Sequence, residues 1–239
     1  MAARAALITG GSSGIGLAIA RALGEDGYGL TVAARRAEKL ETAANELRRD
    51  GLEVEAMPTN MADEDQIKAL GARHRDRFGR LDVLVNNAGV GIGGAIADAE
   101  TKKLDMQLDV NLRAVYLTTR ESLPMLKEAG GEHCKALVLN MASIAGKFGQ
   151  GWLAAYSATK FGVVGLTQAL HKEHAADGVQ ATALCPGFVN TARTDWLEGV
   201  PKQERIQPED IAEAVRYLLR TSRACIVPEI QFIRAGDAM

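Results

Sequence analysis

The chain has 239 residues, 47% of them hydrophobic, which is enough to bury the core of one large α/β domain and excludes a disordered or fibrous protein. Its 28 Lys and Arg residues against 30 Asp and Glu give a formal net charge of -2 without a long basic run, so no nucleic-acid partner is expected. No apolar segment reaches the roughly 20 residues of a membrane span, and we expect a cytoplasmic protein with no membrane partner.

Short apolar runs alternate along the chain with longer segments of helical period. The runs predict seven strands, at residues 5–9, 30–34, 54–58, 81–85, 135–141, 180–185 and 226–233. The segments between them predict helices at 15–26, 37–50, 63–78, 102–129, 155–177 and 208–221. Regular alternation of this kind is typical of a parallel sheet covered on both faces. We therefore predict a single α/β domain over residues 1–239, with a Rossmann-like, doubly wound parallel sheet of seven strands.

Local signals agree with these boundaries. Asp63 precedes a helical segment, Gly27 and Gly51 follow helices, and Pro208 stands at a helix start. No linker or repeat divides the chain. The least regular stretch, at about 187–207, is expected to be a mobile loop that contacts the substrate.

The three cysteines, Cys134, Cys185 and Cys225, lie far apart in the sequence. Their number is odd and no two form a Cys-x-x-Cys pair, so neither a disulfide framework nor a zinc site is indicated. We expect buried or idle thiols in a reducing compartment, and no metal site.

A glycine-rich loop follows the first predicted strand and opens the first helix. Its backbone N–H groups and the positive helix end suit a pyrophosphate, although the spacing Gly-x-x-x-Gly-x-Gly is neither the common dinucleotide fingerprint nor an ATP loop. An ordinary strand-helix turn is the alternative. The residues predicted to bind the cofactor here are Gly10, Ser12, Ser13, Gly14, Ile15 and Gly16.

The end of the second predicted strand carries Arg35 and Arg36, where an NAD site has an acidic residue for the ribose 2′-hydroxyl. A guanidinium suits a 2′-phosphate, which a carboxylate would repel. Two solvated cations at a helix start are the alternative, but they would oppose the helix dipole. We predict NADP(H) as the cofactor.

Tyr156 and Lys160 are four residues apart at the start of a predicted helix and so share one face. A phenol is a poor acid-base catalyst at neutral pH, and a fixed positive charge beside it lowers its pKa. Ser143 follows the fifth strand, at the sheet edge where such folds bind ligands. Each signal alone is weak, since the spacing arises by chance and Ser143 could simply shape a turn.

Several motifs stand in a fixed order along nearly the whole chain: Thr9 to Gly16, Asn86-Asn87-Ala88-Gly89, Asn111, Ser143, Tyr156, Lys160 and Pro186-Gly187. Together they resemble the motif set of the short-chain dehydrogenase/reductase family. The resemblance implies a hydride transfer between a nicotinamide cofactor and a carbonyl or alcohol carbon.

The resemblance also implies a role for each catalytic residue. Tyr156 is the proton donor in reduction and the base in oxidation, and Ser143 polarises and positions the carbonyl oxygen. Lys160 holds the nicotinamide ribose and lowers the pKa of Tyr156. Asn111, which interrupts the long helix, holds a water that relays protons.

Further cofactor contacts follow from the same resemblance. Asn60, where the family often has Asp, meets the adenine, with the Met61 backbone beside it. Val189 and Thr191 contact the carboxamide. The remaining implied contacts, on the adenosine side and around the nicotinamide, are Asn87, Ala88, Gly89, Pro186 and Gly187.

The substrate is poorly encoded, because the expected pocket walls lie in loops. If Trp152, Phe188 and Trp196 face the site, they favour an apolar or aromatic substrate, and ordinary packing is the alternative for each. The expected partner is a small-molecule carbonyl or alcohol, with the 3-oxoacyl or 3-hydroxy acid type as one option. The helices at 102–129 and 155–177 resemble those that pair across a two-fold axis, so a homodimer or homotetramer is expected.

Two other classes stay open. A catalytically silent NADP(H) sensor on the same scaffold should have lost Tyr156 or Lys160, and this chain has kept both. An epimerase or dehydratase usually needs a larger substrate domain, for which the roughly fifty residues after Thr191 leave little room.

Overall fold

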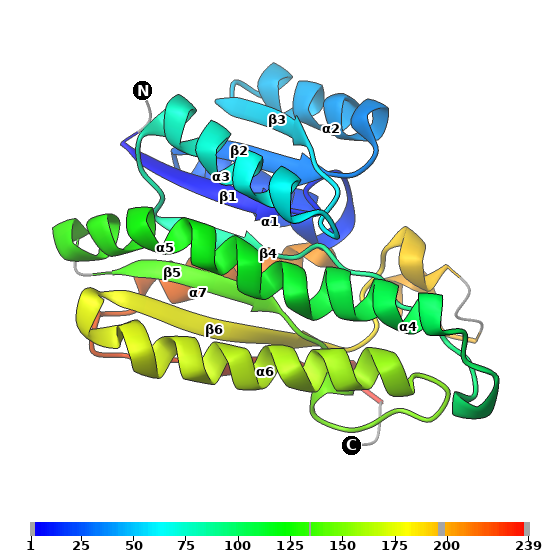
Figure 1. The fold of residues 1–239 in the computed structure, drawn as a ribbon. Coiled ribbons are helices and arrows are strands. Elements are labelled where there is room, and N and C mark those ends of the chain that lie inside the picture. Colours follow the sequence, from blue (N-terminus) through cyan, green and yellow to red (C-terminus); the bar gives the residue numbers. More distant parts are fainter. Residues whose placement is uncertain (1–2, 134, 196–198, 237–239) are drawn as a thin grey trace.

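Seven parallel strands form one sheet at the centre of the structure, a computed structural model that describes residues 3–133, 135–195 and 199–236 (Figure 1). Their order across the sheet is β3-β2-β1-β4-β5-β6-β7. The strands are β1 (Arg4–Thr9), β2 (Tyr28–Ala34), β3 (Val54–Pro58), β4 (Val83–Asn86), β5 (Ala136–Met141), β6 (Val179–Pro186) and β7 (Glu229–Phe232). The order reverses between β1 and β4, which makes the sheet doubly wound, as predicted.

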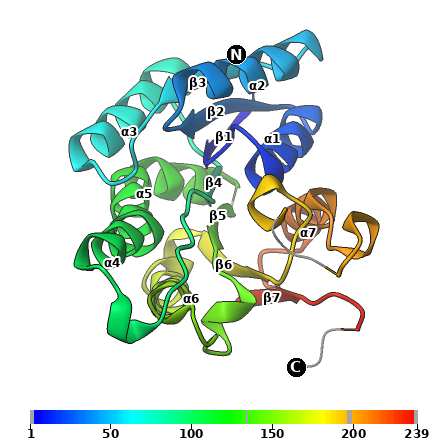
Figure 2. The same ribbon diagram turned by 90° about the vertical axis from the view of Figure 1, so that its right-hand side faces the viewer.

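Helices cover both faces of the sheet (Figure 2). One face carries α1 (Gly14–Glu25), α2 (Ala37–Arg49) and α7 (Pro208–Arg220), and the other carries α3 (Glu64–Phe78), α4 (Thr101–Leu108), α5 (Ala114–His133) and α6 (Ala154–His174). Successive strand residues point to opposite faces, so Ile8 packs with the α1, α2 and α7 side chains and Leu7 with those of α3, α5 and α6. The two-sided core explains why the strands read as continuous apolar runs.

The helix expected at 102–129 is two helices joined by a π-helical turn, Asp109–Arg113, and α5 continues to His133. A π turn places one extra residue in a helical turn and rotates the side chains that follow. The reason is a tertiary contact: Asn111, in the middle of the turn, is fully buried against a distant loop. Hydrophobic periodicity cannot predict such a contact, so it predicted one continuous helix.

Two other boundaries differ from the expectation. The strand expected at 226–233 is only Glu229–Phe232, because Pro228 has no N–H to donate to the ladder, although its carbonyl accepts from Ala183 N at 3.0 Å. The helix expected at 155–177 ends at His174 and tightens into a 3₁₀ turn that Gly178 closes with a φ of 76°.

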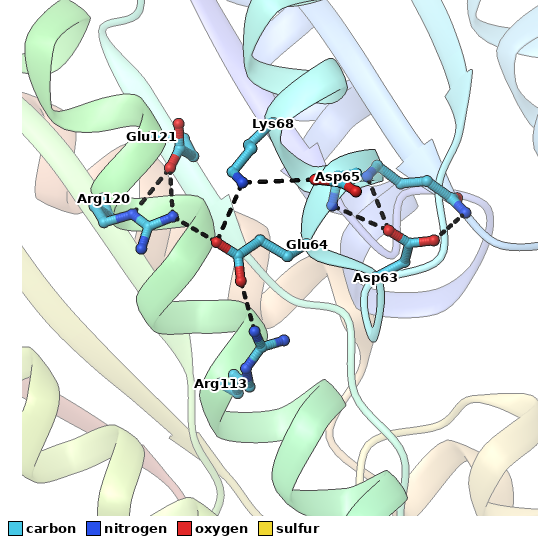
Figure 3. A network of polar contacts seen from close by, with 8 residues as sticks. Asp63, Glu64, Asp65, Lys68, Arg113, Arg120 and Glu121 are labelled. Carbon is cyan, nitrogen blue, oxygen red and sulfur yellow. Dashed lines mark hydrogen bonds and ion pairs between the residues drawn. The ribbon is translucent and has the colours of Figure 1, made fainter.

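An exposed network of charges joins α3 to the π turn and α5 (Figure 3). Asp63 caps α3, as predicted, by accepting hydrogen bonds from backbone N–H groups of the first turn at 3.0 and 3.2 Å. Glu64 beside it binds Arg113, the last residue of the π turn, at 2.6 Å and Arg120 of α5 at 3.0 Å. Hydrogen bonds from Arg120 and then Lys68 lower the pKa of the Glu64 carboxyl. Exposed pairs add little stability, but these orient α3 against the turn.

The loop at 187–207 is tied at its base rather than unstructured. Val189 forms an isolated parallel bridge with Ile206. Arg205 is 6% exposed and donates to the carbonyls of Thr194 at 2.8 Å and Val200 at 3.0 Å. Residues 196–198, and with them Trp196, lie outside the described residues. The mobility of this loop stays a prediction.

In the described part of the chain, no helix combines the length and apolar character that a membrane span requires. Those same residues bring no group of His, Cys, Asp or Glu side chains together that suits a metal ion. Cys185 is a buried thiol and Cys225 an exposed one, whereas Cys134 lies outside the described residues.

Candidate active site

The residues singled out in the sequence meet at the carboxyl edge of the sheet, which faces the viewer in Figure 2. This follows from the topology, because the carboxyl ends of parallel strands share one edge. The glycine loop follows β1, Asn87 follows β4, Ser143 follows β5, and Gly187 follows β6. The start of α6 brings Tyr156 and Lys160 to the same edge.

Ser143 and Tyr156 form the polar centre of the site. The Ser143 hydroxyl donates to the Pro186 carbonyl at 3.3 Å and accepts from Ala145 N at 3.2 Å, which fixes its position. Burial raises the pKa of the Tyr156 phenol, while a hydrogen bond with Ser143 and the charge of Arg193 act in the opposite direction. A phenol and a hydroxyl thus lie side by side, and both could donate to one substrate oxygen if the Ser143 O–H turned away from the Pro186 carbonyl.

Lys160 lies beneath this pair, with 3% of its surface exposed. Its Nζ donates to the Met141 carbonyl at 2.6 Å and lies 5.6 Å from the centre of the Tyr156 ring. Burial, and after it the charge of Arg193, lowers the pKa of Lys160 to about 7. The cation whose charge lowers the pKa of Tyr156 in this structure is Arg193, and the same effect of Lys160, expected from the family resemblance, stays a prediction.

The side chain of Asn111 holds the segment that follows β4. Its Oδ1 accepts from Val90 N at 2.7 Å, and its Nδ2 donates to Val90 O at 2.8 Å and to Thr159 Oγ1 at 3.2 Å. Gln107, one helical turn earlier and 2% exposed, accepts from Ile92 N at 3.1 Å. Two buried amides therefore fix alternate backbone groups of residues 90–92, as a neighbouring strand would.

Three alternate glycines of this segment make room for the site's side chains. A Cβ at Gly89 would lie 3.2 Å from Asn111 Oδ1 and 3.7 Å from Lys160 Nζ, and one at Gly91 would lie 3.7 Å from the Tyr156 ring. A Cβ at Gly93 would overlap the indole of Trp152 at 2.0 Å. Residues two apart in an extended segment share a face, so this glycine face lines the site.

Aromatic side chains stand at the rim. Trp152 is 66% exposed and has a φ of 67°, which is rare for a bulky residue. Its carbonyl accepts from Gly94 N at 2.8 Å. Phe188 is 39% exposed. These two can offer apolar surface to a ligand, and Trp196 lies outside the described residues.

The glycine loop is held by the segment after β4. Gly10 and Gly14 have φ values of 68° and 54°, which glycine adopts freely. Asn87 Nδ2 donates to the carbonyls of Thr9 at 3.0 Å and Gly10 at 3.1 Å, and Thr9 Oγ1 accepts from the N–H groups of Asn87 and Ala88 at 3.0 Å. The N-cap, Ser13, makes no capping hydrogen bond with its side chain. The start of α1, which includes Ile15 and Gly16, can therefore receive an anion.

The loop after β6 closes against the glycine loop. Gly187 N donates to Phe232 O at 2.9 Å, which anchors the Pro186-Gly187 pair to the end of β7. Val189 is buried, and a Cβ added to Gly14 would lie 2.9 Å from Thr191 Cγ2. The loop after β6 therefore lies against the glycine loop.

Further along the carboxyl edge of the sheet, Arg35 and Arg36 are exposed at the end of β2. Among the described residues, neither guanidinium has a hydrogen bond or an ion pair. Asn60 lies after β3, where its Oδ1 accepts from Ala62 N at 3.3 Å and keeps a second lone pair. The side chain of Met61 packs in the core with Ile67, so only its backbone faces the edge.

Sequence reasoning missed several residues of the site. Gln107 precedes Asn111 by four residues and so shares its helix face, a signal that was available. Thr159 acts through a hydrogen bond to a distant segment, and Thr9, which opens the glycine-loop motif, had been given no role of its own. Arg193, two residues after Thr191, sits in an irregular loop, where no sequence pattern shows its direction.

Comparisons with known proteins agree with this geometry. The profile of the short chain dehydrogenase family matches residues 4–199. An uncharacterised oxidoreductase of Staphylococcus aureus is 36% identical over 227 residues, which are 95% of each chain. A putative ketoacyl reductase of Streptomyces coelicolor is 38% identical over 254 aligned positions, covering 97% of this chain and 95% of the relative.

Solved structures agree as well. An alcohol dehydrogenase of the archaeon Thermococcus sibiricus, in complex with 5-hydroxy-NADP, superposes with a TM-score of 0.89 at 32% identity and covers 99% of this chain and 98% of its own. A variant of actinorhodin polyketide ketoreductase with NADPH gives a TM-score of 0.85 at 36% identity and 97% of both chains. The chain therefore belongs to the short-chain dehydrogenase family of oxidoreductases.

Proposed function

We propose that this protein is an NADP(H)-dependent oxidoreductase that transfers a hydride between the nicotinamide and a carbonyl or secondary alcohol carbon. The observation that carries the proposal is the placement of Ser143 and Tyr156 side by side above the buried Lys160, at the sheet edge next to the glycine loop. The substrate is a small molecule, and the reaction belongs to those that act on CH–OH groups.

The residues present fit such a cofactor. The uncapped start of α1 and the loop of Gly10, Ser12, Ser13 and Gly14 suit a pyrophosphate, because glycine lets phosphate approach the backbone. Arg35, with Arg36 beside it, would bind a 2′-phosphate with a guanidinium that has no other partner among the described residues. The 5-hydroxy-NADP and the NADPH in the two solved relatives support the same choice.

The remaining cofactor contacts are proposed as the family resemblance implies. Asn60, the Met61 backbone, Asn87, Ala88 and Gly89 would line the adenosine side and the ribose. Around the nicotinamide, Pro186, Gly187, Val189 and Thr191 would fix which face of the ring is presented. Their places at the carboxyl ends of β3, β4 and β6 support this arrangement.

The bound cofactor supplies or accepts the hydride. In reduction, Tyr156 donates the proton to the carbonyl oxygen, and Ser143 donates a hydrogen bond that holds this oxygen in place. Lys160, whose ammonium is near Gly89, would hold ribose hydroxyls, and its charge would stabilise the phenolate left on Tyr156. Asn111 would keep a water beside Lys160 for proton return. In oxidation the same groups act in reverse, with Tyr156 as base.

The surface outside the site supports an oligomer. Tyr116 of α5 is 56% exposed and Phe161 of α6 is 47% exposed, on helices that lie next to each other. Apolar side chains on two long neighbouring helices are typical of a two-fold interface. We propose a homodimer or homotetramer formed by the helices at 102–129 and 155–177. A cytoplasmic location and a mobile substrate loop at 187–207 stay predictions.

The test is NADPH oxidation with a panel of aldehydes and ketones, with NADH in parallel and cofactor binding followed by fluorescence. Tyr156→Phe should lower kcat by about 10²- to 10⁴-fold, the usual contribution of a general acid, while the Kd for NADPH changes little. Tyr217→Phe, on the exposed face of α7, is the matched control and should keep full activity. Substantial turnover by Tyr156→Phe would contradict the assigned role.

The alternative is a catalytically silent NADP(H)-binding sensor. Tight NADPH binding without turnover on the whole panel would favour it over the enzyme. The joint retention of Ser143, Tyr156 and Lys160 argues for the enzyme, because a sensor has no need of a proton donor.

A further inference from the structure

Arg193 is a cation at the catalytic end of the site that no described residue neutralises. It lies in the short 3₁₀ turn Ala192–Thr194 and is exposed. Across residues 3–133, 135–195 and 199–236, its guanidinium has no hydrogen bond and no ion pair. By contrast, Asp195 nearby is paired with Lys202 at 2.7 Å. An unpaired guanidinium is suited to a ligand that is an anion.

The Arg193 guanidinium lies close to two glycines of the segment after β4. A Cβ at Gly89 would lie 3.9 Å from its Nη1, and a Cβ at Gly91 would lie 3.8 Å from its Nη2. The same point at Gly91 is 3.7 Å from the edge of the Tyr156 ring. The guanidinium and the phenol therefore flank one small space, and a chain of only a few carbon atoms spans the distance between them.

The electrostatics of the site leave this positive charge uncompensated. The charge of Arg193 acts on both Tyr156 and Lys160, and no carboxylate of a described residue shifts the pKa of either group. Two cations at such a site repel each other and attract an anion, which would lower the free energy of the filled site.

The phosphates of the cofactor are a second source of negative charge, but the geometry disfavours them. A Cβ at Gly14, in the glycine loop, would have only Thr191 within 4 Å, whereas one at Gly89 or Gly91 would have Arg193 within that distance. The guanidinium is thus near the catalytic end of the surface, away from the glycine loop where the pyrophosphate is proposed to bind.

We propose that the substrate carries a carboxylate, which Arg193 binds while the reacting carbonyl accepts hydrogen bonds from Ser143 and Tyr156. The substrate class is then the short oxo acids, or the corresponding hydroxy acids in the reverse direction. This proposal rests on the proposed oxidoreductase function and specifies its substrate. In the reaction the carboxylate is unchanged: the carbonyl carbon receives the hydride from NADPH and the carbonyl oxygen receives the proton from Tyr156.

The test compares each acid with its own uncharged ester. Pyruvate, acetoacetate and 4-oxopentanoate place the carboxylate progressively further from the carbonyl carbon, and their ethyl esters keep the carbonyl while removing the charge. The wild-type protein should reduce at least one acid with a kcat/KM more than 10-fold above that of its ester. The preferred acid then reports the distance between Arg193 and the reacting carbon.

Variants of Arg193 separate recognition from folding. Arg193→Met keeps a long side chain without the charge and should lower the acid-to-ester ratio of kcat/KM by about 10- to 100-fold, as expected for loss of a charge-assisted hydrogen bond. Arg193→Lys should restore part of this ratio. The control is Arg75→Met, in the last turn of α3, which removes an exposed charge far from the carboxyl edge and should leave the ratio as it is.

Two results would overturn the proposal. One is an acid-to-ester ratio that does not respond to Arg193→Met. The other is an NADPH KM that rises to the same degree with acids and esters in this variant, which would assign Arg193 to a cofactor phosphate. If esters and ketones are turned over but no acid is, the carboxylate proposal fails while the oxidoreductase function stands.

A binding measurement decides the case in which nothing is turned over. The NADP⁺-loaded protein is titrated calorimetrically with lactate, 3-hydroxybutyrate and 4-hydroxypentanoate, and with the ethyl ester of each. The difference in affinity between acid and ester measures carboxylate binding without requiring turnover. Binding of an acid that Arg193→Met abolishes would support the carboxylate site even if the hydride transfer were absent. Equal binding of acid and ester would reject it.

Discussion

The two ends of the proposed ligand surface are both rich in glycine, but the glycines face different kinds of neighbour. In the glycine loop, a Cβ at Gly16 would lie 2.4 Å from the Gly10 carbonyl and 2.4 Å from Asn87 Nδ2, both of which are fixed by hydrogen bonds. At the substrate end, the neighbours of Gly91 and Gly93 include the side chain of Arg193 and the exposed indole of Trp152.

This difference separates a rigid end from an adaptable end. A pyrophosphate is the same in every cofactor molecule, so its site gains from backbone groups held in one geometry. Substrates differ among related enzymes, and exposed side chains on loops can change without disturbing the sheet. We expect substitutions at the first end to cost stability and cofactor affinity, and those at the second to change substrate choice.

The largest effect is expected from Gly16→Ala. The new Cβ meets backbone atoms that cannot move aside, so overpacking should lower the free energy of unfolding by about 1–3 kcal/mol and weaken NADPH binding more than 10-fold. Gly131→Ala is the matched control: nothing lies within 4 Å of its Cβ near the end of α5, outside the proposed interface, so it should stabilise the protein by up to about 1 kcal/mol. Urea unfolding measures the stability of each variant, and fluorescence titration measures its affinity for NADPH. If Gly16→Ala changed neither the free energy of unfolding nor the affinity for NADPH, the glycine loop would not be the rigid end of the site.

The next effect is a change of cofactor preference in Arg35→Asp. Loss of the guanidinium and gain of a carboxylate that repels the 2′-phosphate should shift the ratio of kcat/KM between NADPH and NADH by about 100-fold towards NADH. Arg75→Asp, an equal change of charge on α3, should leave the ratio unchanged. An unaltered preference in Arg35→Asp would place the 2′-phosphate elsewhere.

A smaller effect concerns acid stability in the cofactor half of the sheet. His74 of α3 is fully buried between Thr31 Oγ1 at 2.7 Å and the Arg80 carbonyl at 2.9 Å, and burial lowers its pKa to about 4. The unfolded chain takes up the proton below about pH 6.5, but the folded protein resists it, so stability falls as the pH falls from 6.5 towards 4.

From this residue, the free energy of unfolding should be about 2 kcal/mol lower at pH 5 than at pH 7.5. Urea unfolding at the two pH values measures it. In His74→Gln, which cannot titrate, the difference should shrink by that amount. The same pH dependence in both proteins would show that His74 is not responsible.

The smallest effect is expected from Gly93→Ala, at the adaptable end. Its Cβ would overlap Trp152, but the indole is 66% exposed and can swing away. We expect a free energy of unfolding within about 0.5 kcal/mol of wild type, a change in tryptophan fluorescence and a few-fold change in KM for aromatic ketones. A loss of stability as large as that of Gly16→Ala would remove the distinction between the two ends.

Much of the cofactor end was predictable from sequence because its signals are local. The glycine loop, the basic residues after β2 and the cap at Asp63 each involve neighbours in the chain, so a short window contains the whole interaction. The doubly wound sheet followed from the same alternation of apolar strands and amphipathic helices. The Tyr156 and Lys160 pair was visible because one helix turn joins its members.

The tertiary structure alone decided the rest. The π turn depends on the contact of Asn111 with Val90, between segments that periodicity treats separately. The direction of Arg193 depends on where the loop after β6 lies against the glycines after β4. Sequence determined which chemical groups reach the carboxyl edge of the sheet, while their distances and charges were set by packing between elements far apart in the chain, because only folding brings those elements into contact.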